Sequence, residues 1–223
     1  PALLQPRFSG RHISRDELKP QHCAQVGKAL AQFHKAGEDF YLSRQAHRGV
    51  FWWRSESSRV QSLIPAEDAK LLQDEIQAFD DLRQHADQLP SGIIHGDMFH
   101  DNVLFDGDNL SGILDIYNAA TAFWLFDLAI VANDWCSLPD GTIDPAREDA
   151  LLRAYHAERP FVAFEYDAWP ILTRTAAMRF WLSRLLPALG LENNGDSEKK
   201  IKDPDELKQI LLARIHTPAV LPA

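Results

Sequence analysis

Apolar side chains recur at helical spacing along most of the chain. Between residues 20 and 36 they follow three–four spacing, with Pro20 suited to the first turn and Gly37 to the C-terminal stop, which predicts a helix. An amphipathic helix is also predicted over 67–88, and further helical segments centre on 123–136, 145–157, 167–188 and 203–215. Residues 38–65 lack a clear period and are interpreted as an irregular connection that buries its aromatic side chains.

Strand patterns are concentrated near the middle of the chain. Ile93–Ile94 and Val103–Phe105 are short apolar runs, and the sequence Asp106–Asn109 is typical of a hairpin turn. Ser111–Leu114 is predicted to be the returning strand, which ends at Asp115. The predicted fold class is therefore α+β, mainly helical, with a small β-hairpin element.

Composition and charge narrow the classes of partner. The 223 residues, 45% of them hydrophobic, are enough for one sizeable core. A net charge of −9 argues against a nucleic-acid partner, since such proteins present a basic face. No apolar window is long enough to span a membrane. Cys23 and Cys136 do not form a close pair and are predicted to be buried thiols, and with no signal-peptide pattern the expected location is cytoplasmic.

Three polar side chains gather around the predicted hairpin. Asp97 follows the first apolar run, Asn102 precedes the next strand, and Asp115 closes the last one. Because one strand begins where the other ends, Asn102 and Asp115 are expected side by side, with the loop of Asp97 folded over them. Oxygen ligands suit Mg²⁺, and a carboxylate can accept a hydroxyl proton. The pattern predicts phosphoryl transfer to an alcohol, with Asp97 as the base and Asn102 and Asp115 on the metal.

Neighbouring residues are predicted to support this loop. His95 is expected to brace it by hydrogen bonds, as is Asp101. Asp127 interrupts an apolar run, and a buried aspartate is costly unless hydrogen-bonded. We therefore expect Asp127 to accept hydrogen bonds from the backbone near the loop.

Several other side chains allow two interpretations. His100 fits either a contact with the transferring phosphate or an exposed loop position. Arg179 and Arg184 fit either structural ion pairs or solvated positions, with substrate contact as the alternative. The tryptophans are expected in the core rather than in a ligand platform, namely Trp52, Trp53, Trp124, Trp169 and Trp181.

At the loop and hairpin the sequence resembles the aminoglycoside phosphotransferase and choline kinase superfamily, whose fold is protein-kinase-like. His95, Asp97, Asn102 and Asp115 match its catalytic-loop and metal-binding motifs one for one. Leu104 falls where this superfamily places an apolar residue beneath the adenine. The resemblance implies ATP as co-substrate, Mg²⁺ as cofactor and a small-molecule acceptor.

Within that superfamily the chain is most similar to the bacterial homoserine kinases, which implies phosphorylation of the homoserine side-chain hydroxyl in threonine biosynthesis. The similar stretches are 5–11, 22–27, 96–107, 126–130, 133–136, 179–184 and 202–206. Aminoglycoside, choline, methylthioribose and fructosamine kinases remain alternatives, as does an inactive kinase-like module. A metal-dependent phosphohydrolase, which needs a nucleophile or a two-metal ligand set, is disfavoured because no His-x-His or Asp-x-Asp cluster lies near Asp97, apart from Asp106 and Asp108 in the turn.

The resemblance also predicts how the chain is divided. Residues 1–10 are expected to be the last strand and hinge of an N-terminal lobe, and 11–223 the helical C-terminal catalytic lobe. The phosphate-covering loop and strand lysine of that first lobe are not found in this sequence. Without them we expect this stretch alone to lack kinase activity. We also expect an exposed apolar hinge face that promotes self-association.

Overall fold

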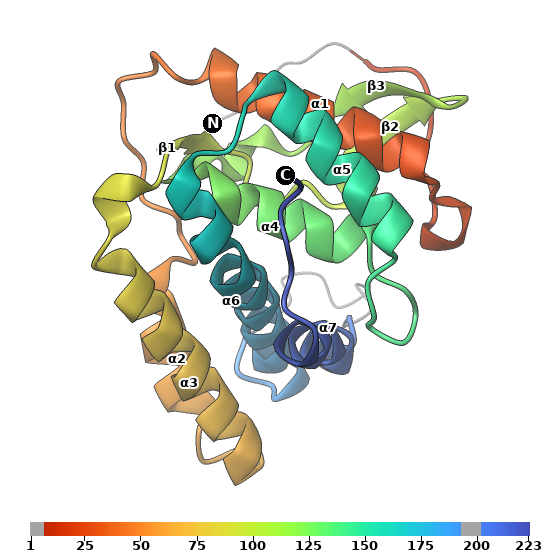
Figure 1. Cartoon of the computed structure of the whole chain (residues 1–223). Coiled ribbons are helices and arrows are strands. Elements are labelled where there is room, and N and C mark those ends of the chain that lie inside the picture. Colours follow the sequence, from red (N-terminus) through yellow and green to blue (C-terminus); the bar gives the residue numbers. More distant parts are fainter. Residues whose placement is uncertain (1–6, 193–201) are drawn as a thin grey trace.

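The fold is mainly helical, with two small antiparallel sheets, and the predicted α+β class is confirmed (Figure 1). The computed structural model describes residues 7–192 and 202–223. Its helices are α1 (Pro20–Ala36), α2 (Val50–Val60), α3 (Ala66–Arg83), α4 (Trp124–Trp135), α5 (Pro145–Glu158), α6 (Ala163–Ala188) and α7 (Pro204–His216). Its strands are β1 (Ser91–Ile94), β2 (Val103–Asp106), β3 (Asn109–Ile113) and β4 (Ala120–Phe123).

The helical predictions hold except between α1 and β1. The interpretation of 38–65 as irregular was wrong, because α2 occupies part of it, and α3 ends at Arg83 rather than near residue 88. Trp53 of α2 is buried edge-on against Phe79 of α3, with ring centroids 4.9 Å apart, whereas Phe51 is 70% exposed. Packing between α2 and α3 therefore stabilises a helix whose own sequence has little periodicity.

The hairpin forms as predicted, but the strand before it pairs elsewhere. β2 and β3 are antiparallel, with Val103 opposite Ile113, and Arg11 extends this sheet by a bridge to Phe105. β1 pairs instead with β4, a strand that the sequence analysis did not predict. Only Phe123 of β4 lay within the predicted helical segment 123–136, and Ala120, Thr121 and Ala122 before it show no strand pattern of their own. The last strand and hinge predicted over residues 1–10 lie mostly outside the described residues.

The core is organised around α4, which lies at the centre of the molecule (Figure 1). Every residue of α4 except Phe126 is buried, since α6 packs along this helix and α1, α5 and β1 also contact it. Cys23 and Cys136 are buried free thiols, as predicted. The predicted core tryptophans are buried, apart from the half-buried Trp52. No helix in the described part of the chain has the length and apolarity that crossing a membrane requires.

The packing of α1 on α5 depends on a glycine. A β-carbon added at Gly27 would lie 2.3 Å from the carbonyl oxygen of Leu151 on α5. We predict that Gly27→Ala lowers the free energy of unfolding by about 1–3 kcal/mol, because the two helices must separate. At a solvent-exposed position in a helix, the change from glycine to alanine instead raises the free energy of unfolding by about 1 kcal/mol. The sign of the change in unfolding free energy therefore tests the contact.

Chemical denaturation of the variant and of Lys28→Ala, an exposed neighbour on α1, provides the measurement. The control should change stability by less than about 0.5 kcal/mol. A Gly27→Ala protein as stable as wild type would contradict the close approach.

Candidate active site

One face of α4 holds the loop between β1 and β2 in place. Asp127, Asp134 and Trp135 are seven and eight residues apart, so they project from the same side of the helix. Asp127 accepts hydrogen bonds from the backbone N–H groups of His95 at 2.7 Å and Gly96 at 2.8 Å. Trp135 donates to the carbonyl of Met98 at 2.9 Å. The predicted hydrogen bonds from the loop backbone to Asp127 are therefore present.

Asp134 anchors the far end of the same loop. Its carboxylate accepts hydrogen bonds from His100, at 2.7 Å from the backbone N–H and at 2.8 Å from the imidazole Nδ1. Arg15 donates to the other oxygen at 2.6 Å. Burial alone would raise the pKa of Asp134, but the contacts with His100 and Arg15 outweigh it and the pKa lies below its ordinary value. His100 is thus a half-buried structural partner, and its placement does not match an exposed loop position.

Asp127 is fully buried and is compensated by a chain of polar side chains from α1 and α5. His34 lies 3.0 Å from its carboxylate through Nε2, and the Nδ1 of His34 lies 2.7 Å from the hydroxyl of Tyr155. Burial lowers the pKa of His34, so the neutral ring donates through Nε2 and accepts from Tyr155 through Nδ1. Arg159, paired with Glu165 at 2.5 Å, donates in turn to Tyr155 at 2.9 Å.

His95 fixes the loop against the hairpin, as predicted. Its side chain is completely buried, and Nε2 lies 2.8 Å from the carbonyl oxygen of Leu114. Gly96 follows with φ +77°, a left-handed conformation that glycine adopts without strain. The chain therefore turns sharply after β1 and presents Asp97 at the wall of a cavity.

Asp97 lies where solvent access is restricted. Asn102 donates to its backbone carbonyl at 2.7 Å, and the Asn118 amide donates to its carboxylate at 3.4 Å. Burial raises the pKa of the Asp97 carboxyl above its ordinary value, and the positive charge of Arg179 opposes part of that rise. A carboxylate at the wall of a cavity can accept a proton from a hydroxyl group that binds there.

Asn102 and Asp115 lie at the same end of the hairpin, since the N–H of Leu114 donates to the carbonyl of Asn102 at 2.8 Å. The Asn102 amide nitrogen faces Asp97, which leaves its side-chain oxygen for another partner. Asp115 adopts φ +61°, in the left-handed region, and its carboxylate accepts a hydrogen bond from Tyr117 at 3.1 Å. Backbone strain of this kind gathers at functional sites.

Within residues 7–192 and 202–223 no group of three or more His, Cys, Asp or Glu side chains could hold a metal ion. Mg²⁺ bound with a nucleotide takes only one or two protein oxygens, because phosphates and waters fill the remaining positions. One free amide oxygen and one carboxylate fit that requirement.

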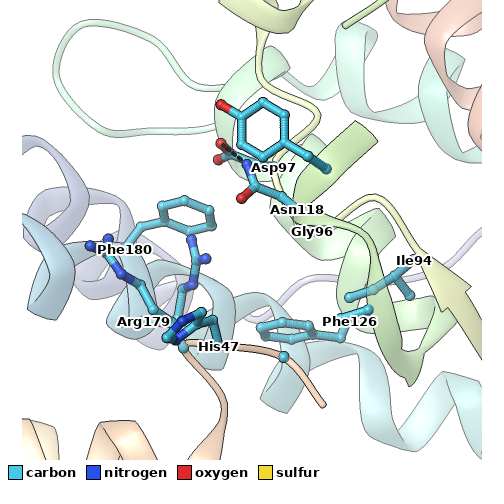
Figure 2. A pocket seen from close by; sticks show the side chains of 12 residues that line it. His47, Ile94, Gly96, Asp97, Asn118, Phe126, Arg179 and Phe180 are labelled. Carbon is cyan, nitrogen blue, oxygen red and sulfur yellow. Dashed lines mark hydrogen bonds between the residues drawn. The ribbon is translucent and has the colours of Figure 1, made fainter. Parts of the chain in front are cut away.

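A cavity of about 450 Å³ opens beside Asp97. Gly96, Asp97 and Asn118 lie on one side of it, and Arg179, Phe180 and His47 lie on another (Figure 2). Arg48 and Tyr117 also line it, and Asp97 is the only carboxylate among the described residues that do so. The volume is within the range of small-molecule sites, about 300–1,000 Å³.

The remaining candidates are distributed as follows. Leu104 is half-buried on β2, and Asp101 pairs with Lys202 at 2.8 Å, as expected for a loop brace. Arg184 forms a structural ion pair with Glu206 at 2.6 Å, whereas Arg179 lines the cavity. Sequence reasoning missed Arg48 and Tyr117, because nothing in their local pattern distinguishes them from surface residues.

Known proteins resemble this chain in sequence and in fold. The family model described as "Phosphotransferase enzyme family" matches residues 1–161. A homoserine kinase of Pseudomonas aeruginosa (strain LESB58) is 42% identical over 227 residues, which cover 99% of this chain and 70% of that protein. A homoserine kinase of Methylobacillus flagellatus is 43% identical over 188 residues, or 83% of this chain and 57% of that protein. The chain thus spans only part of the length of these relatives.

Solved structures agree on the fold. A choline/ethanolamine kinase family protein from Mesorhizobium loti superposes with a TM-score of 0.69 at 18% identity, over 93% of this chain and 66% of that one. With the family model and the close relatives, this establishes the assignment: the chain belongs to the phosphotransferase enzyme family, which transfers phosphate from ATP.

Proposed function

We propose that this protein phosphorylates the side-chain hydroxyl of L-homoserine with ATP. The observation that carries the proposal is the Asp97 carboxylate at the wall of a small cavity, with Asn102 and Asp115 at the end of the hairpin behind it. The homoserine kinases that match at 42% and 43% identity support the choice of acceptor. A cytoplasmic location and self-association stay predictions.

In the proposed mechanism Asp97 orients the acceptor hydroxyl and takes its proton. General-base catalysis of this kind contributes about 10²- to 10⁴-fold. Asn102 and Asp115 would hold Mg²⁺, which when bound neutralises the charge on the nucleotide phosphates. Leu104 would pack beneath the adenine. His95 and Asp127 would keep the loop in register through their hydrogen bonds to Leu114 and to the loop backbone.

The charges around the cavity bear on the alternative acceptors. Arg179 and Arg48 line it, the latter paired with Glu192 at 3.3 Å, and among the described residues Asp97 is the one carboxylate at its wall. The charge of Arg179, which no ion pair in the described part of the chain neutralises, disfavours cationic acceptors such as choline and aminoglycosides, because like charges repel at close range. An acceptor that carries a carboxylate is better matched.

The direct test is a panel assay. Full-length protein with Mg-ATP would be supplied with homoserine, choline, methylthioribose, fructosamine or an aminoglycoside, and ADP release would be measured. We expect the highest kcat/KM for homoserine. A higher value for any other alcohol would reassign the acceptor, and no turnover of any of them would favour an inactive kinase-like module.

Asp97→Asn removes the proposed base but keeps the size of the side chain. We predict a fall in kcat of roughly 10²-fold or more, with nucleotide affinity retained. Asp106→Asn, which changes an exposed carboxylate at the end of β2, is the matched control and should retain activity. Steady-state kinetics and nucleotide titration supply both readouts. An undiminished rate in Asp97→Asn would refute the assignment.

Asp115→Asn should act on the metal instead. Loss of one anionic ligand is predicted to raise the Mg²⁺ concentration needed for half-maximal activity, and to weaken ATP binding with it. Activity measured across a magnesium titration separates this effect from that of Asp97→Asn. An unchanged magnesium dependence would mean that Asp115 does not hold the ion.

Asp127→Ala tests the anchoring of the loop. The N–H groups of His95 and Gly96 would lose their acceptor, which should cost about 1–3 kcal/mol of unfolding free energy. Denaturant titration measures this loss, with the exposed Asp74→Ala as the control. Equal stability of the two variants would show that the buried hydrogen bonds contribute little.

A further inference from the structure

Arg179 differs from the other arginines of α6. Arg174 pairs with Glu75 at 3.1 Å and Arg184 pairs with Glu206 at 2.6 Å. In the described part of the chain the guanidinium of Arg179 has no carboxylate partner, and it lies 3.7 Å from the ring centroid of Phe180. Among the described residues, Arg179 therefore has no carboxylate within ion-pair distance.

Its surroundings make that arrangement costly. The side chain is half-buried at the cavity wall, and burial lowers the pKa of Arg179 to about 10, with the charge of Asp97 opposing the shift. Withdrawing a cation from water without an ion pair is unfavourable. A bound anion would relieve that cost, and the stacked guanidinium offers two parallel donors to it.

The other cation of the cavity is already engaged. Arg48 pairs with Glu192 at 3.3 Å and lies over the ring of Trp52. Arg179 faces the cavity from α6, on a different side from Asp97 (Figure 2). A ligand between them would present an anionic group to Arg179 and a neutral, proton-donating group to Asp97.

We propose that Arg179 binds the carboxylate of the amino-acid acceptor and so selects homoserine over alcohols that lack this group. This inference rests on the proposed function. Either of two anions could bind the guanidinium of Arg179. One is the carboxylate of the acceptor, and the other is the transferring phosphate. A carboxylate contact acts only on acceptors that carry one, whereas a phosphate contact acts on every acceptor.

The experiment compares two acceptors in the full-length protein. 3-Aminopropan-1-ol is homoserine without its carboxylate. In Arg179→Met we expect kcat/KM for homoserine to fall about 10- to 100-fold, as for loss of a charge-assisted hydrogen bond. For 3-aminopropan-1-ol, a cation that loses only the repulsion of Arg179, kcat/KM should not fall. Arg179→Lys, which keeps the charge without the planar fork, should lose less.

Arg153→Met is the control, because it removes the same charge from an exposed arginine on α5 and should leave both acceptors unaffected. An equal loss with both acceptors in Arg179→Met would overturn the inference and indicate a phosphate contact. A selective loss in Arg48→Met, with none in Arg179→Met, would overturn it as well.

Two outcomes need no variant. Wild-type protein should prefer homoserine to 3-aminopropan-1-ol, and equal kcat/KM values would contradict the inference even if Arg179→Met fails to fold. Absence of homoserine turnover by wild-type protein would instead overturn the proposed function, and this inference with it.

Discussion

The site depends on the buried carboxylate of Asp127. A charge with no exposure to water must be fully hydrogen-bonded, and here two of its donors are the N–H groups of His95 and Gly96. Burial acts to raise the pKa of Asp127, yet these contacts and His34 hold it below the ordinary value. The same contacts that compensate Asp127 determine where the chain turns after β1. Burial of Asp127 in the core and placement of Asp97 therefore depend on the same hydrogen bonds.

The network around Asp127 connects elements that are distant in sequence. Neutral His34 joins α1 to α4, and Tyr155 and Arg159 continue the chain of donors to α5 and its C-terminal end. Each of these side chains is hydrogen-bonded to the next, and a fully hydrogen-bonded buried network is rigid. A loop held from both ends, by Asp127 and by Asp134, can keep a carboxylate in position before any ligand binds, and such preorganisation is the larger part of catalysis in phosphoryl transfer.

Much of this could be predicted from the sequence, because the decisive signals are local. The turn at 106–109 fixes the hairpin, and an aspartate in the apolar run of α4 had to be hydrogen-bonded. The helix α2 and the strand β4 were missed because their stability comes from contacts with α3 and β1, which no periodicity in their own residues records. Arg179 and Arg184 looked alike in the sequence. Only the fold pairs Arg184 with Glu206 and leaves Arg179 at the cavity.

We propose that a loop anchored on Asp127 holds Asp97 ready for the acceptor hydroxyl. A crystal structure of the full-length protein with homoserine and a non-hydrolysable ATP analogue would show both contacts at once. We expect the homoserine hydroxyl within hydrogen-bonding distance of the Asp97 carboxylate, with the N–H groups of His95 and Gly96 still donating to Asp127. A hydroxyl bound away from Asp97, or a loop detached from Asp127 in that complex, would contradict it.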